Sequence, residues 1–152
     1  MVPILLAIHD YPVRATMRAL LTLCGYTVAG EASTAEEAIE KFKEINPGFV
    51  VLDFDPEKFD VIKAIKGIRA INSEVMIIVH SSGDSRSPMI EAMNLGIKDW
   101  VFNMLPTQPE RFMISVDLLI GDAHRIEVMK RLLKEDIDFC FGCLRKANIY
   151  GL

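Results

Sequence analysis

Residues Phe49-Val50-Val51-Leu52-Asp53 form a short apolar run that ends on an aspartate. Three other runs share this pattern: residues 4–8 before His9-Asp10, residues 75–79 before His80-Ser81, and residues 100–102 before Asn103. Short apolar runs are typical of strands buried on both faces of a parallel sheet. The carboxyl ends of parallel strands open onto one crevice. We therefore expect one pocket surrounded by Asp10, Asp53, Ser81 and Asn103.

The composition indicates one globular domain and excludes several classes of protein. The chain has 152 residues, of which 51% are hydrophobic and 25% charged. The net charge of -4 argues against direct binding to nucleic acid, because such proteins usually carry a basic patch. No apolar run approaches the roughly 18 residues of a membrane span, and the amino terminus lacks the features of a signal peptide. We expect a cytoplasmic protein.

Strand-like and helix-like patterns alternate along the whole chain. Helical spacing of apolar residues extends from Val13 to Cys24 and ends at Gly25, and residues 26–30 follow as a strand. Further helices are predicted after the cap Ser33 or Thr34, around residues 61–68, from Pro88, and from Pro106 or Pro109. Five strands alternating with five helices predict a doubly wound α/β sheet, since parallel neighbours require helical crossovers.

Several stretches of the chain resemble the receiver domain of bacterial two-component response regulators. These stretches are residues 14–21, 25–32, 51–53, 90–96 and 98–100. The resemblance covers residues 3 to about 120 and implies a receiver domain over residues 1–120. It also implies a flavodoxin-like, five-stranded parallel sheet in the order 2-1-3-4-5. Members of the family take a phosphoryl group from a sensor histidine kinase or phosphotransfer protein onto an aspartate, with the help of Mg²⁺.

By this resemblance Asp53 is the phosphoacceptor, Ser81 is the switch hydroxyl and Trp100 is the switch aromatic. Asn103 stands where the family has a lysine, and it can donate a hydrogen bond but brings no charge. Met104 follows it in place of the family's proline.

The predicted Mg²⁺ ligands are Asp10, Asp53 and, more weakly, Asp55. The family's acidic pair corresponds to Ile8-His9 in an ungapped alignment, or to His9-Asp10 if the next loop is one residue shorter. We prefer the second alignment, because Tyr11-Pro12 then falls where the family often has His-Pro. At least one metal carboxylate is lost either way, and a neutral imidazole is a poor ligand for Mg²⁺.

Three functional interpretations follow from these residues. In the first, Asp53 is phosphorylated and the protein signals to a downstream protein partner. In the second, the chain is a pseudo-receiver, a binding or dimerisation module that does not depend on phosphorylation. In the third, His9 and a neighbouring carboxylate form the acid–base pair of some other enzyme. We do not expect an enzyme, since no glycine-rich phosphate loop follows the first strand.

The carboxyl-terminal segment, residues 121–152, lies beyond the resemblance. Its apolar residues recur at helical spacing opposite charged ones, which predicts an amphipathic helical extension. This helix either packs on its own domain or pairs with a second copy to form a homodimer. The segment also holds Cys140 and Cys143 as a CxxC motif, without the second pair of ligands that a zinc site requires.

Overall fold

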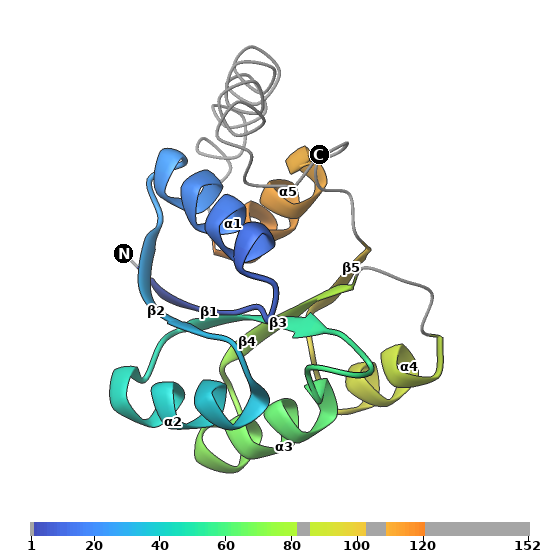
Figure 1. Ribbon diagram of the computed structural model, residues 1–152. Coiled ribbons are helices and arrows are strands. Elements are labelled where there is room, and N and C mark those ends of the chain that lie inside the picture. Colours follow the sequence, from blue (N-terminus) through green and yellow to red (C-terminus); the bar gives the residue numbers. More distant parts are fainter. Residues whose placement is uncertain (1, 82–85, 103–108, 121–152) are drawn as a thin grey trace.

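The computed structural model describes residues 2–81, 86–102 and 109–120 as one α/β domain (Figure 1). Its elements alternate along the chain. They are β1 (Pro3–Ala7), α1 (Tyr11–Leu23), β2 (Thr27–Ala32), α2 (Ala35–Ile45), β3 (Phe49–Phe54), α3 (Val61–Ile71), β4 (Met76–Ser81), α4 (Arg86–Asn94), β5 (Asp99–Phe102) and α5 (Pro109–Ile120).

The five strands form one parallel sheet in the order β2-β1-β3-β4-β5. This order confirms the flavodoxin-like topology implied by the resemblance. Helices α2, α3 and α4 cover one face of the sheet, and α1 and α5 cover the other (Figure 1). The sheet extends from β1 to β2 on one side and to β3, β4 and β5 on the other. The carboxyl ends of β1 and β3 therefore flank the topological switch point, where such sheets bind ligands.

Two apolar cores lie on the two faces of the sheet. Successive residues of a strand point to opposite faces, so Leu5 and Leu52 belong to the core beneath α2 and α3, whereas Leu6 and Val51 belong to the core beneath α1 and α5. All six residues of β3 are buried. This double burial explains why the central strand is a continuous apolar run rather than an alternating one.

The helix ends predicted at Thr34 and Gly25 are confirmed. Thr34 caps α2 by accepting a hydrogen bond from the Glu37 N–H, and Asn46 ends the same helix in the left-handed conformation with a φ of 47°. Gly25, just beyond α1, also has a positive φ, of 83°. The prediction that α4 begins at Pro88 was wrong by two residues, because proline is tolerated throughout the first turn of a helix and does not mark its first residue.

Within the described residues, no helix combines the length and the apolar character needed to cross a membrane. The predicted extension, residues 121–152, lies outside the described part of the chain.

Candidate functional site

Asp53 lies at the carboxyl end of the central strand. Leu52 is in register with Ala7 of β1, and Asp53 itself is in register with His80 of β4. The residue is only 6% exposed. A buried carboxylate requires hydrogen-bond donors, and Oδ2 of Asp53 accepts the backbone N–H of His9 at 2.9 Å. Its Oδ1 makes no hydrogen bond to any other residue that the structure describes.

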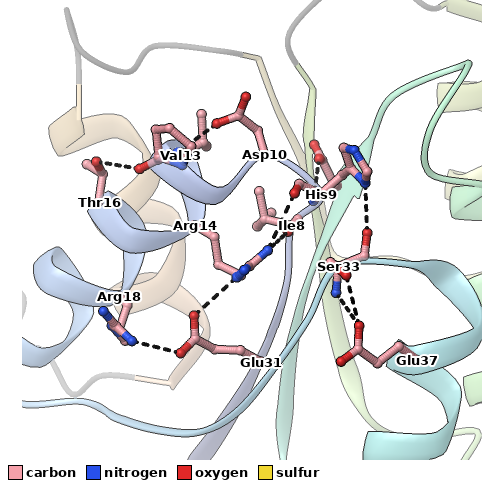
Figure 2. Close-up of polar contacts among 12 residues, drawn as sticks. Ile8, His9, Asp10, Val13, Arg14, Thr16, Arg18, Glu31, Ser33 and Glu37 are labelled. Atoms are coloured by element: carbon pink, nitrogen blue, oxygen red, sulfur yellow. Dashed lines mark hydrogen bonds and ion pairs between the residues drawn. The ribbon is translucent and has the colours of Figure 1, made fainter. Parts of the chain in front are cut away.

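His9 approaches Asp53 through its backbone and turns its ring elsewhere. The ring Nδ1 lies 3.0 Å from the backbone carbonyl of Ser33, so Nδ1 carries the proton in this contact (Figure 2). Ser33 is itself held by Glu37, whose Oε2 accepts both the N–H and the hydroxyl of Ser33. The Ser33 N–H is the main cause that lowers the pKa of Glu37 below its ordinary value. These bonds fix the loop that follows β2 against the end of β1.

The side chains of Asp10 and Asp55 serve local backbone structure. Asp10 caps α1, with its Oδ1 accepting the Val13 N–H at 3.0 Å, and Figure 2 shows its carboxylate turned toward that helix. Asp55 accepts the N–H groups of Glu57 and Lys58 in the turn after β3. At this turn His9 rather than Asp10 contacts Asp53, and it does so through its backbone N–H.

The end of β4 contributes Ser81 and His80, which lie on opposite sides of their strand. Ser81 is fully buried and in register with Phe54, directly beyond Asp53. His80 is 2% exposed, and neither of its ring nitrogens has a hydrogen-bond partner among the residues that the structure describes. Its Nδ1 lies 3.9 Å from Asp53 Oδ1, which is too long for a hydrogen bond. The apolar pattern of the strand did not indicate that His80 would be this close to Asp53.

Trp100 of the edge strand β5 packs against Phe54 of β3. The two ring centroids are 5.4 Å apart and the rings are inclined by 48°. Trp100 is 6% exposed, and its Nε1 has no hydrogen-bond partner in residues 2–81, 86–102 and 109–120. Because Phe54 follows Asp53 directly, this aromatic pair connects β5 to the end of β3. Asn103, the residue predicted next along this strand, lies outside the described residues.

Arg14 is a residue of this region that the sequence interpretation did not identify. Its Nη1 donates to the backbone carbonyls of Ile8 at 2.7 Å and of His9 at 3.4 Å, and its Nε pairs with Glu31 Oε1 at 3.2 Å (Figure 2). The only sequence signal was an arginine in the first turn of a helix that starts directly after a strand. That signal does not say which way the side chain turns.

Comparison with known proteins identifies the family. The family model of the response regulator receiver domain matches residues 4–117. The chemotaxis protein CheY of Thermotoga maritima is 39% identical over 98 residues, which are 64% of this chain and 80% of that protein. CheY of Bacillus subtilis is 31% identical over 104 residues, which are 68% and 85% of the two chains. The chain belongs to the response regulator receiver domain family.

Solved structures share the fold of this receiver. The CheX–CheY–BeF3–Mg²⁺ complex from Borrelia burgdorferi has a TM-score of 0.71 at 19% identity, covering 80% of this chain and 90% of that one. The response regulator domain of Thermotoga maritima CheB has a TM-score of 0.66 at 20% identity, covering 84% and 97%. Receiver domains are signalling modules of two-component systems, and this chain has the strand order β2-β1-β3-β4-β5.

The described part of this receiver does not present a ligand set for Mg²⁺. Receiver domains generally bind Mg²⁺ at an acidic site, whereas no group of three His, Cys, Asp or Glu side chains is placed to hold a metal ion within the residues described here. Mg²⁺ requires oxygen ligands in nearly octahedral geometry. Of the three predicted carboxylates, that of Asp53 accepts the His9 N–H, that of Asp10 caps α1 and that of Asp55 accepts N–H groups of its own turn.

Proposed function

We propose that this receiver accepts a phosphoryl group on Asp53 from a sensor histidine kinase or phosphotransfer protein in the cytoplasm, and signals through contacts with a downstream protein. The observation that carries this proposal is the geometry of Asp53. Its Oδ2 is held by the His9 N–H, while its Oδ1 makes no hydrogen bond to a described residue. One oxygen thus fixes the carboxylate, and the other is available as the nucleophile.

The transfer follows from these two oxygens. Oδ1 of Asp53 attacks the phosphorus of a phosphohistidine, an O–P bond forms, and the P–N bond breaks. The imidazole of the donor leaves with the electron pair of that bond. The His9 N–H continues to donate to Oδ2, which keeps the carboxyl group in one orientation during the attack. Ser81 at the end of β4 and Trp100 on β5 are the proposed switch residues, and Asn103 is proposed to contact the phosphoryl group.

Mg²⁺ is the cofactor proposed for this site. Asp53 can contribute one oxygen ligand, and phosphoryl oxygens of the donor can contribute others, as in many phosphoryl-transfer sites. Asp10 or Asp55 would have to leave its present hydrogen bonds to act as a second ligand. We therefore propose weak binding of Mg²⁺ in the absence of a phosphodonor.

The test is incubation of the full chain with a small phosphodonor such as phosphoramidate, with and without MgCl₂. We expect one phosphate per chain, located on Asp53 by peptide mass spectrometry and absent from Asp53→Asn. Unmodified protein under all conditions would contradict phosphorylation and favour a phosphorylation-independent binding module.

Sedimentation of the full chain over a range of concentrations tests the proposed homodimer through residues 121–152, and a monomer throughout would exclude it.

A further inference from the structure

One peptide group joins Arg14 to Asp53. The peptide between Ile8 and His9 carries the Ile8 carbonyl, which accepts from Arg14 Nη1 at 2.7 Å, and the His9 N–H, which donates to Asp53 Oδ2 at 2.9 Å. A guanidinium, an amide and a carboxylate therefore form a continuous chain of hydrogen bonds, with the cation at one end and the anion at the other. Figure 2 shows the Arg14 end of this chain at the Ile8 carbonyl.

Several contacts hold the Arg14 guanidinium in place. Its side chain is 15% exposed, and its Nε pairs with Glu31 of the neighbouring strand β2. The Arg14 N–H also bonds to the carbonyl of the capping residue Asp10 at 2.9 Å, so the start of α1 and the guanidinium are fixed to the same turn. Arg18 pairs with the second oxygen of Glu31 but contacts neither carbonyl of the turn in any described interaction.

The charge of Arg14 strengthens the bond that Asp53 receives. A cation on the carbonyl oxygen draws electron density from the amide and makes its N–H a better donor, because successive hydrogen bonds polarise one another. Both ends of this chain are charge-assisted, and such bonds are stronger than bonds between neutral groups. The amide also belongs to a short turn in which the carbonyls of Ile8 and His9 both accept hydrogen bonds from Arg14. The guanidinium therefore sets the direction of the His9 N–H.

We propose that Arg14 is a positioning residue for Asp53, acting through the Ile8–His9 peptide. It aims and polarises the His9 N–H, which holds Oδ2 and leaves Oδ1 to react. This inference rests on the proposed phosphorylation of Asp53 for its kinetic consequence, although the hydrogen-bond chain itself can be tested without phosphorylation.

The kinetic test compares full-length variants with phosphoramidate at a fixed MgCl₂ concentration. We expect Arg14→Met to lower the rate of phosphate incorporation at Asp53 by about tenfold, the size of effect that loss of part of one charge-assisted bond produces. Arg14→Lys keeps the positive charge, so we expect a smaller loss of rate than in Arg14→Met. Some loss remains, because the single lysine nitrogen cannot contact both Glu31 and the Ile8 carbonyl. Arg18→Met, the matched control, should react at the wild-type rate.

The spectroscopic test follows the His9 amide proton by NMR in the same proteins without a phosphodonor. We expect its resonance to move upfield in Arg14→Met and to stay in place in Arg18→Met. An unmoved His9 resonance in Arg14→Met would overturn the proposal whether or not Asp53 is phosphorylated. A wild-type rate in Arg14→Met would also overturn it. Failure of the wild-type protein to react, with the His9 shift observed, would contradict the proposed function and leave the chain of bonds supported.

If Arg14→Met does not fold, Glu31→Gln supplies the test. It removes the carboxylate that fixes the guanidinium and keeps the size of the side chain. We expect a smaller change in the same direction for both the rate and the His9 resonance, and no change in either would overturn the proposal.

Discussion

His80 Nδ1 lies 3.9 Å from Asp53 Oδ1 on the adjacent strand, and both residues are almost fully buried. Within the described part of the chain neither ring nitrogen of His80 has a hydrogen-bond partner, so no bond there replaces the lost hydration of the imidazole. The closeness of the two side chains follows from the register of β3 with β4, which places residue 80 directly beside residue 53. A buried polar group in this situation lowers the stability of the fold.

The first prediction is that His80→Leu raises the free energy of unfolding. Leucine has a similar volume, lacks unpaired polar atoms and suits the apolar surroundings of β4. Since a buried, unsatisfied polar group costs about 1–3 kcal/mol, we expect a gain of about 1 kcal/mol in urea denaturation. Ile78→Val on the same strand is a control and should lose about 1 kcal/mol. A loss of stability in His80→Leu would show that the imidazole has a favourable interaction with Asp53.

The second prediction separates the two roles considered for Asp10. If the residue acts as the cap of α1, Asp10→Ala lowers the free energy of unfolding by about 1 kcal/mol, while Asp10→Asn, which also caps helices, has little effect. Neither change then alters the Mg²⁺ dependence of Asp53 phosphorylation. Asp60→Ala removes the corresponding cap of α3 and serves as a control for stability. A raised Mg²⁺ requirement in Asp10→Asn would instead support Asp10 as a metal ligand.

Asp10 also shows where inference from the sequence stops. An aspartate before a helix is both a capping signal and a candidate ligand, and the sequence does not reveal which backbone or ion its carboxylate faces. The alternation of strands and helices, by contrast, could be predicted from local patterns such as the apolar run ending at Asp53 and the stop signal at Gly25, whereas the order of the strands came from the resemblance to receiver domains. The role of Arg14 depends on a side-chain direction set by contacts with a neighbouring strand, which no local pattern encodes.

The third prediction concerns the pH dependence of stability. The N–H of Ser33 is the main cause that lowers the pKa of Glu37, and burial opposes this effect only in part. A carboxyl group with a lowered pKa in the folded state stabilises the fold above its ordinary value of 4.5, and this contribution is lost as the pH falls through the folded pKa. We expect Glu37→Gln to be less stable than wild type at pH 6 and equal to it near pH 2.

The comparison requires chemical denaturation of both proteins at each pH, because the difference between them isolates Glu37 from other carboxylates. Glu44→Gln, on the exposed side of the same helix, is the control and should change little at either pH. A deficit of Glu37→Gln that persists unchanged at pH 2 would show that packing rather than charge is responsible.

The last prediction uses Trp100, the only tryptophan of the chain, as a reporter of Asp53. Its ring packs on Phe54, whose backbone directly follows Asp53, so a change in the charge and contacts of the carboxylate should alter the indole environment. If Asp53 is the phosphoacceptor, beryllofluoride with Mg²⁺ should change the emission intensity of wild type in a saturable way. Asp53→Asn should give no response, and Phe54→Leu should give a reduced one. An equal response in Asp53→Asn would mean that the reagent acts elsewhere on the chain, whereas a silent wild type would count against a switch that passes from Asp53 through Phe54 to Trp100.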